Sequence, residues 1–115
     1  MTIREVYDSI GADYEGVVKR LPSEALVARL AAKYLNDPTY QQLTDALAAG
    51  DVETAFRAAH TLKGVCQNLG FSNMYAPVFE ITEILRAGSM EGTASRMEEL
   101  KKKYDLTIAC INELD

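Results

Sequence analysis

The feature that most limits what this sequence can fold into is a succession of helix start and stop signals along the chain. Between them, apolar residues recur three and four positions apart, and no segment alternates apolar and polar residues long enough for a convincing strand. Short turns between long helices favour antiparallel neighbours. The sequence therefore predicts an all-α fold: an antiparallel up-and-down four-helix bundle with additional short helical segments at the N-terminus.

We expect one domain over residues 1–115, because a chain of this length can bury a single core without metals or crosslinks. The bundle should occupy about residues 22–114. Residues 1–21 should form an N-terminal helical extension.

Local signals place the helices individually. Thr2 and Glu5 fit a capping box, and Gly11 fits the residue just past the end of a short first helix. The pattern of residues 12–21 leaves their conformation open. Further helices are expected from Ser23 to about Tyr34, from Asp37 to Gly50, from Asp51 to Gly70, from Ser72 to Arg86, and from about Thr93 towards the C-terminus.

Three details of these helices can be checked against a structure. The first of them should bury one apolar row, made of Leu26, Leu30 and Tyr34. Asp37 should cap the next, with Pro38 as its first helical residue. The last should contain a second capping box, formed by residues 95–98.

Composition narrows the possible partners. The net charge of −5 argues against nucleic acid, whose phosphates require a basic face. No apolar run approaches the roughly 20 residues needed to cross a bilayer, and the first residues lack the apolar block of a secretory signal. We therefore expect a cytoplasmic protein with no membrane partner, and a monomer, because no apolar face is left over. Cys66 and Cys110 lie far apart and only one histidine is present, so we expect two buried apolar cysteines and no metal site.

The only histidine, His60, lies in the stretch AAHTLKGVCQNLG, residues 58–70. On a helical wheel, one side of this helix is apolar and consists of Ala55, Ala58, Ala59, Leu62, Val65, Cys66 and Leu69. The other side consists of Glu53, Arg57, His60, Thr61, Gly64, Gln67 and Asn68, with Phe56 and Lys63 at a border. Because His60 lies roughly opposite the centre of the apolar arc, its side chain should face water.

Gly64 makes this histidine more than an incidental surface residue. A glycine inside a helix costs about 1 kcal/mol relative to alanine. Gly64 lies on the outer face, where it is not needed to seat a neighbouring core helix. Bare backbone beside an exposed imidazole indicates that something large must come close.

The chemistry that suits this arrangement is phosphoryl transfer. A neutral imidazole nitrogen is nucleophilic near physiological pH and can accept a phosphoryl group, which brings up to two negative charges. Lys63 can neutralise part of that charge, Gln67 can offer an amide donor, and Arg57 can add long-range attraction. No glycine-rich phosphate loop or carboxylate base accompanies His60. The sequence therefore favours a phosphoryl carrier over a self-sufficient enzyme.

The sequence resembles the histidine-containing phosphotransfer (HPt) domain family. The resemblance is carried by HTLKG at residues 60–64, by Gly70 ten residues after the histidine, and by the surrounding stretches DVETAFRAAHTLKGVCQNLGF and VFEITEILRAG. It covers the chain roughly from residue 20 onwards and is strongest over residues 51–88. The N-terminal twenty residues depart most from the family pattern.

The resemblance implies that His60 is phosphorylated, that Lys63 supports the phosphoryl group and that Gly64 gives the partner room. It implies receiver domains of response regulators and a sensor histidine kinase as partners. The receiver would bring the aspartate and Mg²⁺, and this chain would have no cofactor of its own. Phe56 is a candidate apolar anchor for docking, with plain core packing as an equal alternative.

Two other functions stay open from the sequence. One is a helical docking module that binds receiver domains but has lost phosphotransfer, against which the presence of both His60 and Lys63 speaks. The other is a hydrolase or metal enzyme, which would need clustered ligands that the sequence does not show.

Overall fold

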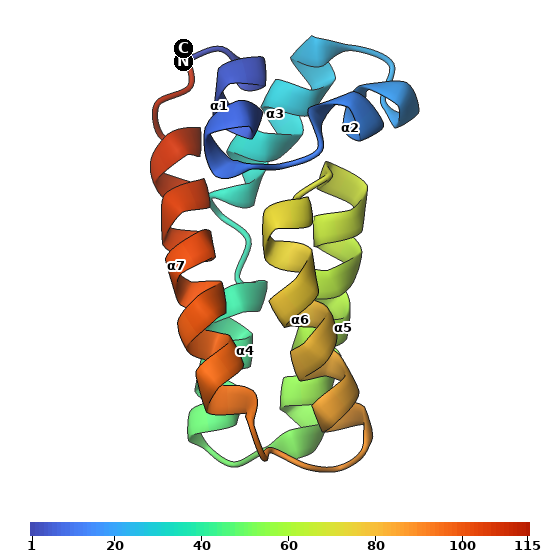
Figure 1. Ribbon diagram of the computed structural model, residues 1–115, viewed down its shortest axis with the longest axis vertical. Helices are drawn as coiled ribbons and strands as arrows, with labels where there is room; N and C mark the ends of the chain where they lie inside the picture. Colours follow the sequence, from blue (N-terminus) through green and yellow to red (C-terminus); the bar gives the residue numbers. More distant parts are fainter.

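The computed structural model describes residues 1–115 and consists of seven α-helices joined by short turns (Figure 1). The helices are α1 (Ile3–Ile10), α2 (Tyr14–Arg20), α3 (Glu24–Tyr34), α4 (Thr39–Ala48), α5 (Val52–Leu69), α6 (Ser72–Arg86) and α7 (Thr93–Ile111). No strand is present, which confirms the predicted all-α class.

The last four helices form the bundle. Helices α5, α6 and α7 each run antiparallel to the helix before them, and α5 packs closely against both α4 and α6, as α6 does against α7 (Figure 1). Helices α4 and α7 are further apart and meet through long side chains: the rings of Tyr40 and Tyr104 stack with centroids 3.8 Å apart and planes inclined by 15°. The predicted antiparallel up-and-down four-helix bundle is therefore confirmed.

The first three helices lie together at one end of this bundle (Figure 1). Helix α1 packs against α7, and the ammonium of Met1 donates to the carbonyl of Glu113 at 2.6 Å and pairs with the carboxylate of Asp115 at 3.0 Å, so the two termini meet. Helix α2 occupies the stretch whose conformation the sequence left open. Helix α3 lies with these N-terminal helices, so the four bundle helices begin at Thr39, later than the expected start near residue 22.

Side-chain caps explain several of the helix starts. Thr2 Oγ1 accepts from the amide of Glu5 at 3.1 Å, and the carboxylate of Glu5 accepts from the amide of Thr2 at 2.9 Å, so the predicted capping box is confirmed. Gly11 ends α1 in the left-handed conformation, also as predicted. Ser23 starts α3 by accepting from the amide of Leu26 at 3.1 Å.

Two predicted helix starts need correction. The capping box at residues 95–98 is wrong, because α7 already begins at Thr93 with Gly92 at its N-cap, and Ser95 Oγ donates to the carbonyl of Gly92 instead. Asp37 is not the N-cap of α4, because Pro38 takes that position and no side chain caps the helix; the carboxylate of Asp37 accepts from the amide of Thr39 at 2.8 Å. The helix begins at Thr39, and Pro38 precedes it rather than forming its first residue.

The buried row of α3 also differs from the prediction. Leu26 and Leu30 are only half-buried, and the fully buried residues are Val27, Ala31 and Tyr34. The reason is that α3 packs on α1, α2 and α5 together. The side of α3 that faces these three helices is the most buried one, and it is not the side with the largest apolar side chains.

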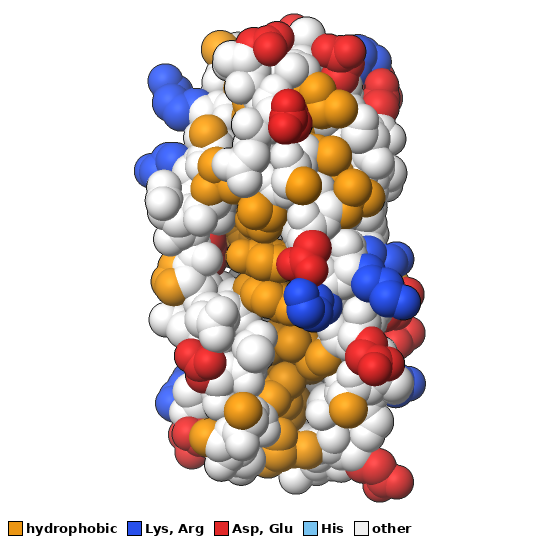
Figure 2. Space-filling view, turned by 90° about the vertical axis from the view of Figure 1, so that its left-hand side faces the viewer, with side chains coloured by type: hydrophobic (Ala, Val, Ile, Leu, Met, Phe, Trp, Pro, Cys, Tyr) orange, Lys and Arg blue, Asp and Glu red, His pale blue; other side chains and the backbone are white.

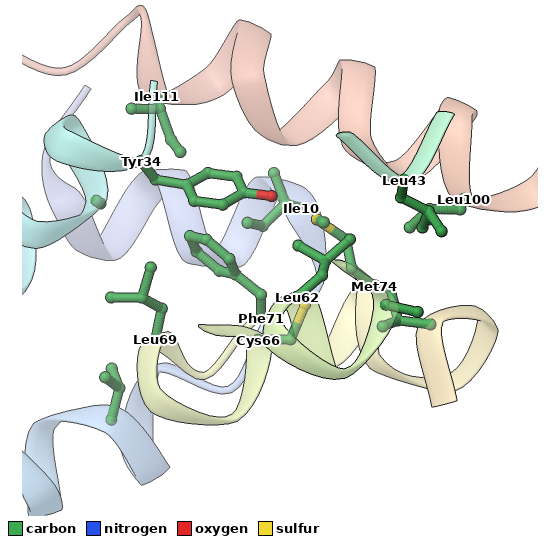
Figure 3. Packing of buried hydrophobic residues seen from close by; sticks show 14 of the residues in the cluster. Ile10, Tyr34, Leu43, Leu62, Cys66, Leu69, Phe71, Met74, Leu100 and Ile111 are labelled. Atoms are coloured by element: carbon green, nitrogen blue, oxygen red, sulfur yellow. The ribbon is translucent and has the colours of Figure 1, made fainter. Parts of the chain in front are cut away.

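The bundle core and the N-terminal helices share one set of buried side chains, part of which Figure 3 shows. The rings of Tyr34 and Phe71 meet edge to face, with centroids 5.3 Å apart, close to Cys66. Cys66 and Cys110 are both buried and unpaired, which confirms the prediction for the two cysteines. Burial raises the pKa of the Cys66 thiol to about 12, so it carries no thiolate at neutral pH.

Hydrophobic side chains also reach the surface along the seam between α4 and α7 (Figure 2). A shallow hollow of about 300 Å³ opens there, with Leu47, Met90 and Met97 among its lining residues. All three are half-buried. The expectation of a monomer assumed no such face, so the oligomeric state stays a prediction to be measured.

Candidate functional site

Helix α5 carries the histidine and is fixed at both ends. At its start, the carboxylate of Asp51 accepts from the amide of Thr54 at 3.1 Å, and this hydrogen bonding lowers the pKa of Asp51. At its end, Gly70 adopts the left-handed conformation (φ 69°) and the amide of Phe71 donates to the carbonyl of Cys66 at 2.8 Å. Both predicted ends of the helix are confirmed.

The last turn of α5 is held by the N-terminal helices. A helix leaves its final carbonyl groups without partners inside the helix. Here donors from three N-terminal residues satisfy four successive carbonyls. Arg20 donates to the carbonyls of Gln67 at 2.6 Å and Asn68 at 3.3 Å, Tyr7 Oη to that of Leu69 at 2.5 Å, and the amide of Asp13 to that of Gly70 at 3.0 Å.

The two faces of α5 follow the predicted wheel. The buried side consists of Ala55, Ala58, Ala59, Leu62, Cys66 and Leu69. Val65, which the wheel also placed there, is half-buried. His60 is exposed on the opposite side, so the prediction that its side chain faces water is confirmed.

Two neighbours on α5 border the imidazole, one on each side along the helix. The ring of Phe56 stacks on that of His60, with centroids 5.9 Å apart and planes inclined by 24°. Gly64 lies one turn further on, and a Cβ atom added there would meet no heavy atom within 4 Å. Packing inside this chain therefore does not require a glycine at Gly64, and the space beside His60 is open.

Lys63 is a cation without a carboxylate partner. It makes no ion pair, and its Nζ lies 5.8 Å from the centroid of the Phe79 ring. An ammonium over an aromatic face is held weakly and keeps its charge uncompensated. Lys63 can therefore neutralise an anionic group that comes to the neighbouring turn.

The other two predicted site residues are more engaged. Arg57 pairs with Glu53 at 3.2 Å and donates to Thr54, both nearer the start of α5, so its charge is partly compensated there. The side-chain amide of Gln67 lies 3.5 Å from the hydroxyl of Tyr75, a long hydrogen bond. Gln67 therefore joins the seam between α5 and α6, beyond Gly64 as seen from His60.

Helix α6 adds three residues that the sequence analysis did not find: Tyr75, Phe79 and Arg86. The rings of Tyr75 and Phe79 stack with centroids 5.9 Å apart, and the guanidinium of Arg86 lies 5.0 Å above the ring of Phe56. Phe79 is 41% exposed, one of the few large apolar side chains on the surface. Their spacing in the sequence could have indicated this row: Phe79 follows Tyr75 by four residues and Arg86 follows Phe79 by seven, which places all three on one side of a helix. That side lies next to the buried row that contains Val78.

We define the His60 face as His60, Gly64 and Gln67 with Phe56 and Lys63 of α5, together with Tyr75 and Phe79 of α6. Across the antiparallel pair, Phe56 faces Arg86, Lys63 faces Phe79, and Gln67 faces Tyr75. Along α5, His60 thus lies between two aromatic–cation pairs. In the first pair the ring (Phe56) is on α5 and the cation (Arg86) on α6; in the second the cation (Lys63) is on α5 and the ring (Phe79) on α6. The face combines the rings of Phe56, Tyr75 and Phe79 with one positive charge, that of Lys63.

What this arrangement offers chemically is an exposed imidazole, a possible nucleophile. His60 lines none of the four hollows of the surface, and no side chain hydrogen-bonds its ring. No group of three or more histidine, cysteine or carboxylate side chains is placed to hold a metal ion. None of the helices combines the length and apolar character needed to span a bilayer.

Comparison with known proteins gives two matches. The model of the Hpt domain family matches residues 36–109, a range that contains His60, the whole of α4, α5 and α6, and most of α7. The chain is also 33% identical over 66 residues to the chemotaxis protein CheA of Halobacterium salinarum (strain ATCC 29341 / DSM 671 / R1), covering 55% of this chain and 10% of that protein. The chain thus spans about a tenth of that relative's length. No solved structure matches.

Proposed function

The chain belongs to the Hpt domain family, and we propose that it accepts a phosphoryl group on His60 from a receiver-domain aspartate or a kinase and passes it to the aspartate of a response regulator. The observation that carries this proposal is the exposed imidazole of His60 beside open space at Gly64. A group that must meet a second macromolecule has to stand on such a convex surface. Hpt domains act in general as phosphocarrier modules, so we do not assign an autonomous enzymatic activity.

The transfer step needs only a lone pair from this chain. A nitrogen of the neutral imidazole forms the new N–P bond while the bond from phosphorus to the aspartate oxygen breaks, and the carboxylate leaves with the bonding electrons. The other ring nitrogen keeps its proton, so no general base is required. We propose Nε2 as the attacking atom, since it is the outer nitrogen of a solvent-facing imidazole.

Charge neutralisation and positioning supply the rest of the catalysis. Lys63 lies one turn from His60 without a carboxylate partner, which suits it to support the phosphoryl oxygens. The partner's receiver domain would bring the Mg²⁺ ion together with its aspartate. Arg57 contributes at longer range, because Glu53 already compensates part of its charge.

The His60 face also supports the kind of partner. Its apolar centre is Phe79, 41% exposed and stacked on Tyr75, and its rim carries the charge of Lys63 and the amide of Gln67. A half-apolar patch with a polar rim is the usual anatomy of a transient protein interface. We propose Phe79 as the main docking anchor for receiver domains and for the sensor kinase, with Phe56 at its edge.

Transfer of labelled phosphate from a purified, phosphorylated receiver domain tests the proposal. The wild-type chain should gain acid-labile label, His60→Gln should gain none, and Thr61→Ala, an exposed neighbour outside the His60 face, should match the wild type. Label retained on His60→Gln would refute the assignment. A stable complex without label on the wild-type chain would instead select the inactive docking module.

Two narrower points have their own measurements. Phosphohistidine NMR should assign the phosphoryl group to Nε2, and a spectrum of the Nδ1 isomer would contradict this. We also keep the proposals of a monomer and a cytoplasmic location. Light scattering on the purified chain and cell fractionation test them.

A further inference from the structure

The rings of Phe56 and His60 form a stacked pair on the surface of α5. Their centroids lie 5.9 Å apart with planes inclined by 24°, within the range in which aromatic pairs attract. The residues are four apart, so the contact is built into the helix and does not depend on a partner. At this separation the stack is offset, and the Phe56 ring borders the imidazole on one side.

Phe56 is itself held in place from two directions. Its ring is half-buried and packs against the hydrophobic core. The guanidinium of Arg86 lies 5.0 Å above that ring and is also within hydrogen-bonding distance of Glu83, at 3.4 Å. These contacts favour one placement of the Phe56 ring, beside the imidazole.

We propose that Phe56 is a positioning residue for phosphotransfer, which orients the imidazole of His60 by stacking, and that Arg86 holds the Phe56 ring in the required place. This inference rests on the proposed function of His60. It gives Phe56 a role that differs from docking and from core packing alone.

The geometry of the imidazole explains why stacking favours the reaction. The lone pair of an attacking ring nitrogen lies in the ring plane and points outward from the ring edge. A neighbour that stacks on the face leaves the edge free while it limits the directions in which the lone pair can point. In-line attack on phosphorus requires one such direction. The rate of transfer therefore rises when the imidazole spends less time in orientations from which it cannot attack.

The dependence of transfer on receiver concentration separates positioning from docking. A docked receiver holds the phosphorus in one direction, so a positioning residue changes the transfer rate at saturating receiver. A docking anchor instead changes the receiver concentration that gives half of that rate. A small donor such as phosphoramidate tumbles freely and meets the imidazole in any orientation, so it does not report on positioning.

The experiment measures transfer from a labelled receiver to the full chain at increasing receiver concentration, with His60→Gln as the blank, and compares the rates at saturating receiver. Phe56→Leu should react about threefold to tenfold more slowly, as expected for losing one aromatic pair, and Phe56→Tyr should restore most of the rate. Tyr40→Leu removes a half-buried aromatic residue from the α4–α7 seam and controls for lost stability; it should react like the wild type. The ring-current shift of the His60 ring protons should be lost in Phe56→Leu and kept in Phe56→Tyr.

Arg86→Lys tests whether Arg86 holds the Phe56 ring in place. It also replaces Phe56→Leu as the test of the proposal if Phe56→Leu does not fold. It keeps the positive charge but loses the planar group above Phe56, so the rate should fall about twofold. A wild-type rate at saturating receiver in Phe56→Leu, or in Arg86→Lys where that variant has to decide, overturns the inference and leaves Phe56 as a docking residue. Absence of phosphohistidine on the wild-type chain would instead count against the proposed function itself.

Discussion

Replacing Gly64 with alanine should make the protein more stable and at the same time a slower phosphoryl acceptor. Glycine inside a helix costs about 1 kcal/mol relative to alanine. A Cβ atom at Gly64 meets nothing within 4 Å, so no clash offsets this gain. The free energy of unfolding should therefore rise by about 1 kcal/mol, and the Tm by about 4 °C.

The same methyl group would stand in the space that a docked receiver occupies. Overfilling a packed contact costs about 1 to 3 kcal/mol, which corresponds to a transfer rate about fivefold to a hundredfold lower. Gly64→Gln should slow transfer further than Gly64→Ala. Phosphorylation of the alanine variant by phosphoramidate should stay within about twofold of the wild type, because this donor needs little room.

Urea unfolding followed by circular dichroism and rapid-quench transfer from a labelled receiver measure the two effects. Gly88→Ala is a matched control: Gly88 also has open space around it, but its φ of +80° disfavours alanine. That control should lose stability and keep its transfer rate. Unchanged transfer in both Gly64 variants, or lower stability of Gly64→Ala, would refute the inference that Gly64 leaves room for the partner and is not needed for packing within the chain.

Three further predictions concern stability and charge. Tyr7→Phe should lower the free energy of unfolding by about 1 to 3 kcal/mol in urea titrations, because it leaves the buried carbonyl of Leu69 without its donor; a variant as stable as the wild type would contradict this. Burial raises the pKa values of Tyr7 and Tyr34 above the ordinary value of 10.0. Their neutral forms therefore contribute fully to the free energy of unfolding below pH 10, and this contribution is lost as the pH rises further. Unfolding measured from pH 8 to 12 should therefore show falling stability above about pH 10, with a shallower fall in Tyr7→Phe; equal slopes would count against it. Lys63→Gln should slow transfer from a receiver about tenfold, as for the loss of one charged hydrogen bond, while Lys63→Arg keeps most of the rate; equal rates in all three proteins would remove Lys63 from the mechanism.

The orientation of His60 could be predicted because it depends on one helix only. The period of 3.6 residues sets which side chains share a face, and the ends of α5 are set by Asp51 and Gly70, whose capping is local. A lone glycine on the polar face completed the signal. The structure adds only that nothing within the chain fills the space next to Gly64.

The contacts that Lys63 and Phe56 make with α6 could not be predicted in the same way. Phe79 and Arg86 meet Lys63 and Phe56 only after two helices have packed with one particular register, which single-helix periodicity does not fix. Phe56 shows the limit most clearly. Its position at the border of the wheel allowed both docking and core packing, and in the structure it packs on the core and stacks on His60 at once.

Short helices depend even more on their surroundings. Helix α2 has seven residues, too few to be stable alone, and its last residue, Arg20, donates to carbonyls at the end of α5. The supposed capping box at residues 95–98 failed for a related reason. The chain enters α7 through Gly92 in a left-handed conformation, so the helix starts before the box and Ser95 lies inside it.

Helices α1 and α2, which lie outside the matched residues 36–109, hold the end of α5 through hydrogen bonds. Gln67 is in the last turn of α5, where carbonyls unpaired within the helix would otherwise favour fraying. Hydrogen bonds from Tyr7, Asp13 and Arg20 close that turn, as the Asp51 cap closes the other end. An interface that forms and separates for each transfer gains speed when its nucleophile is already oriented, because no ordering remains to be done on contact. Under the proposed function, the hydrogen bonds at the end of α5 and the stacking on Phe56 would therefore act on the same quantity, the fraction of encounters in which the imidazole is oriented for transfer.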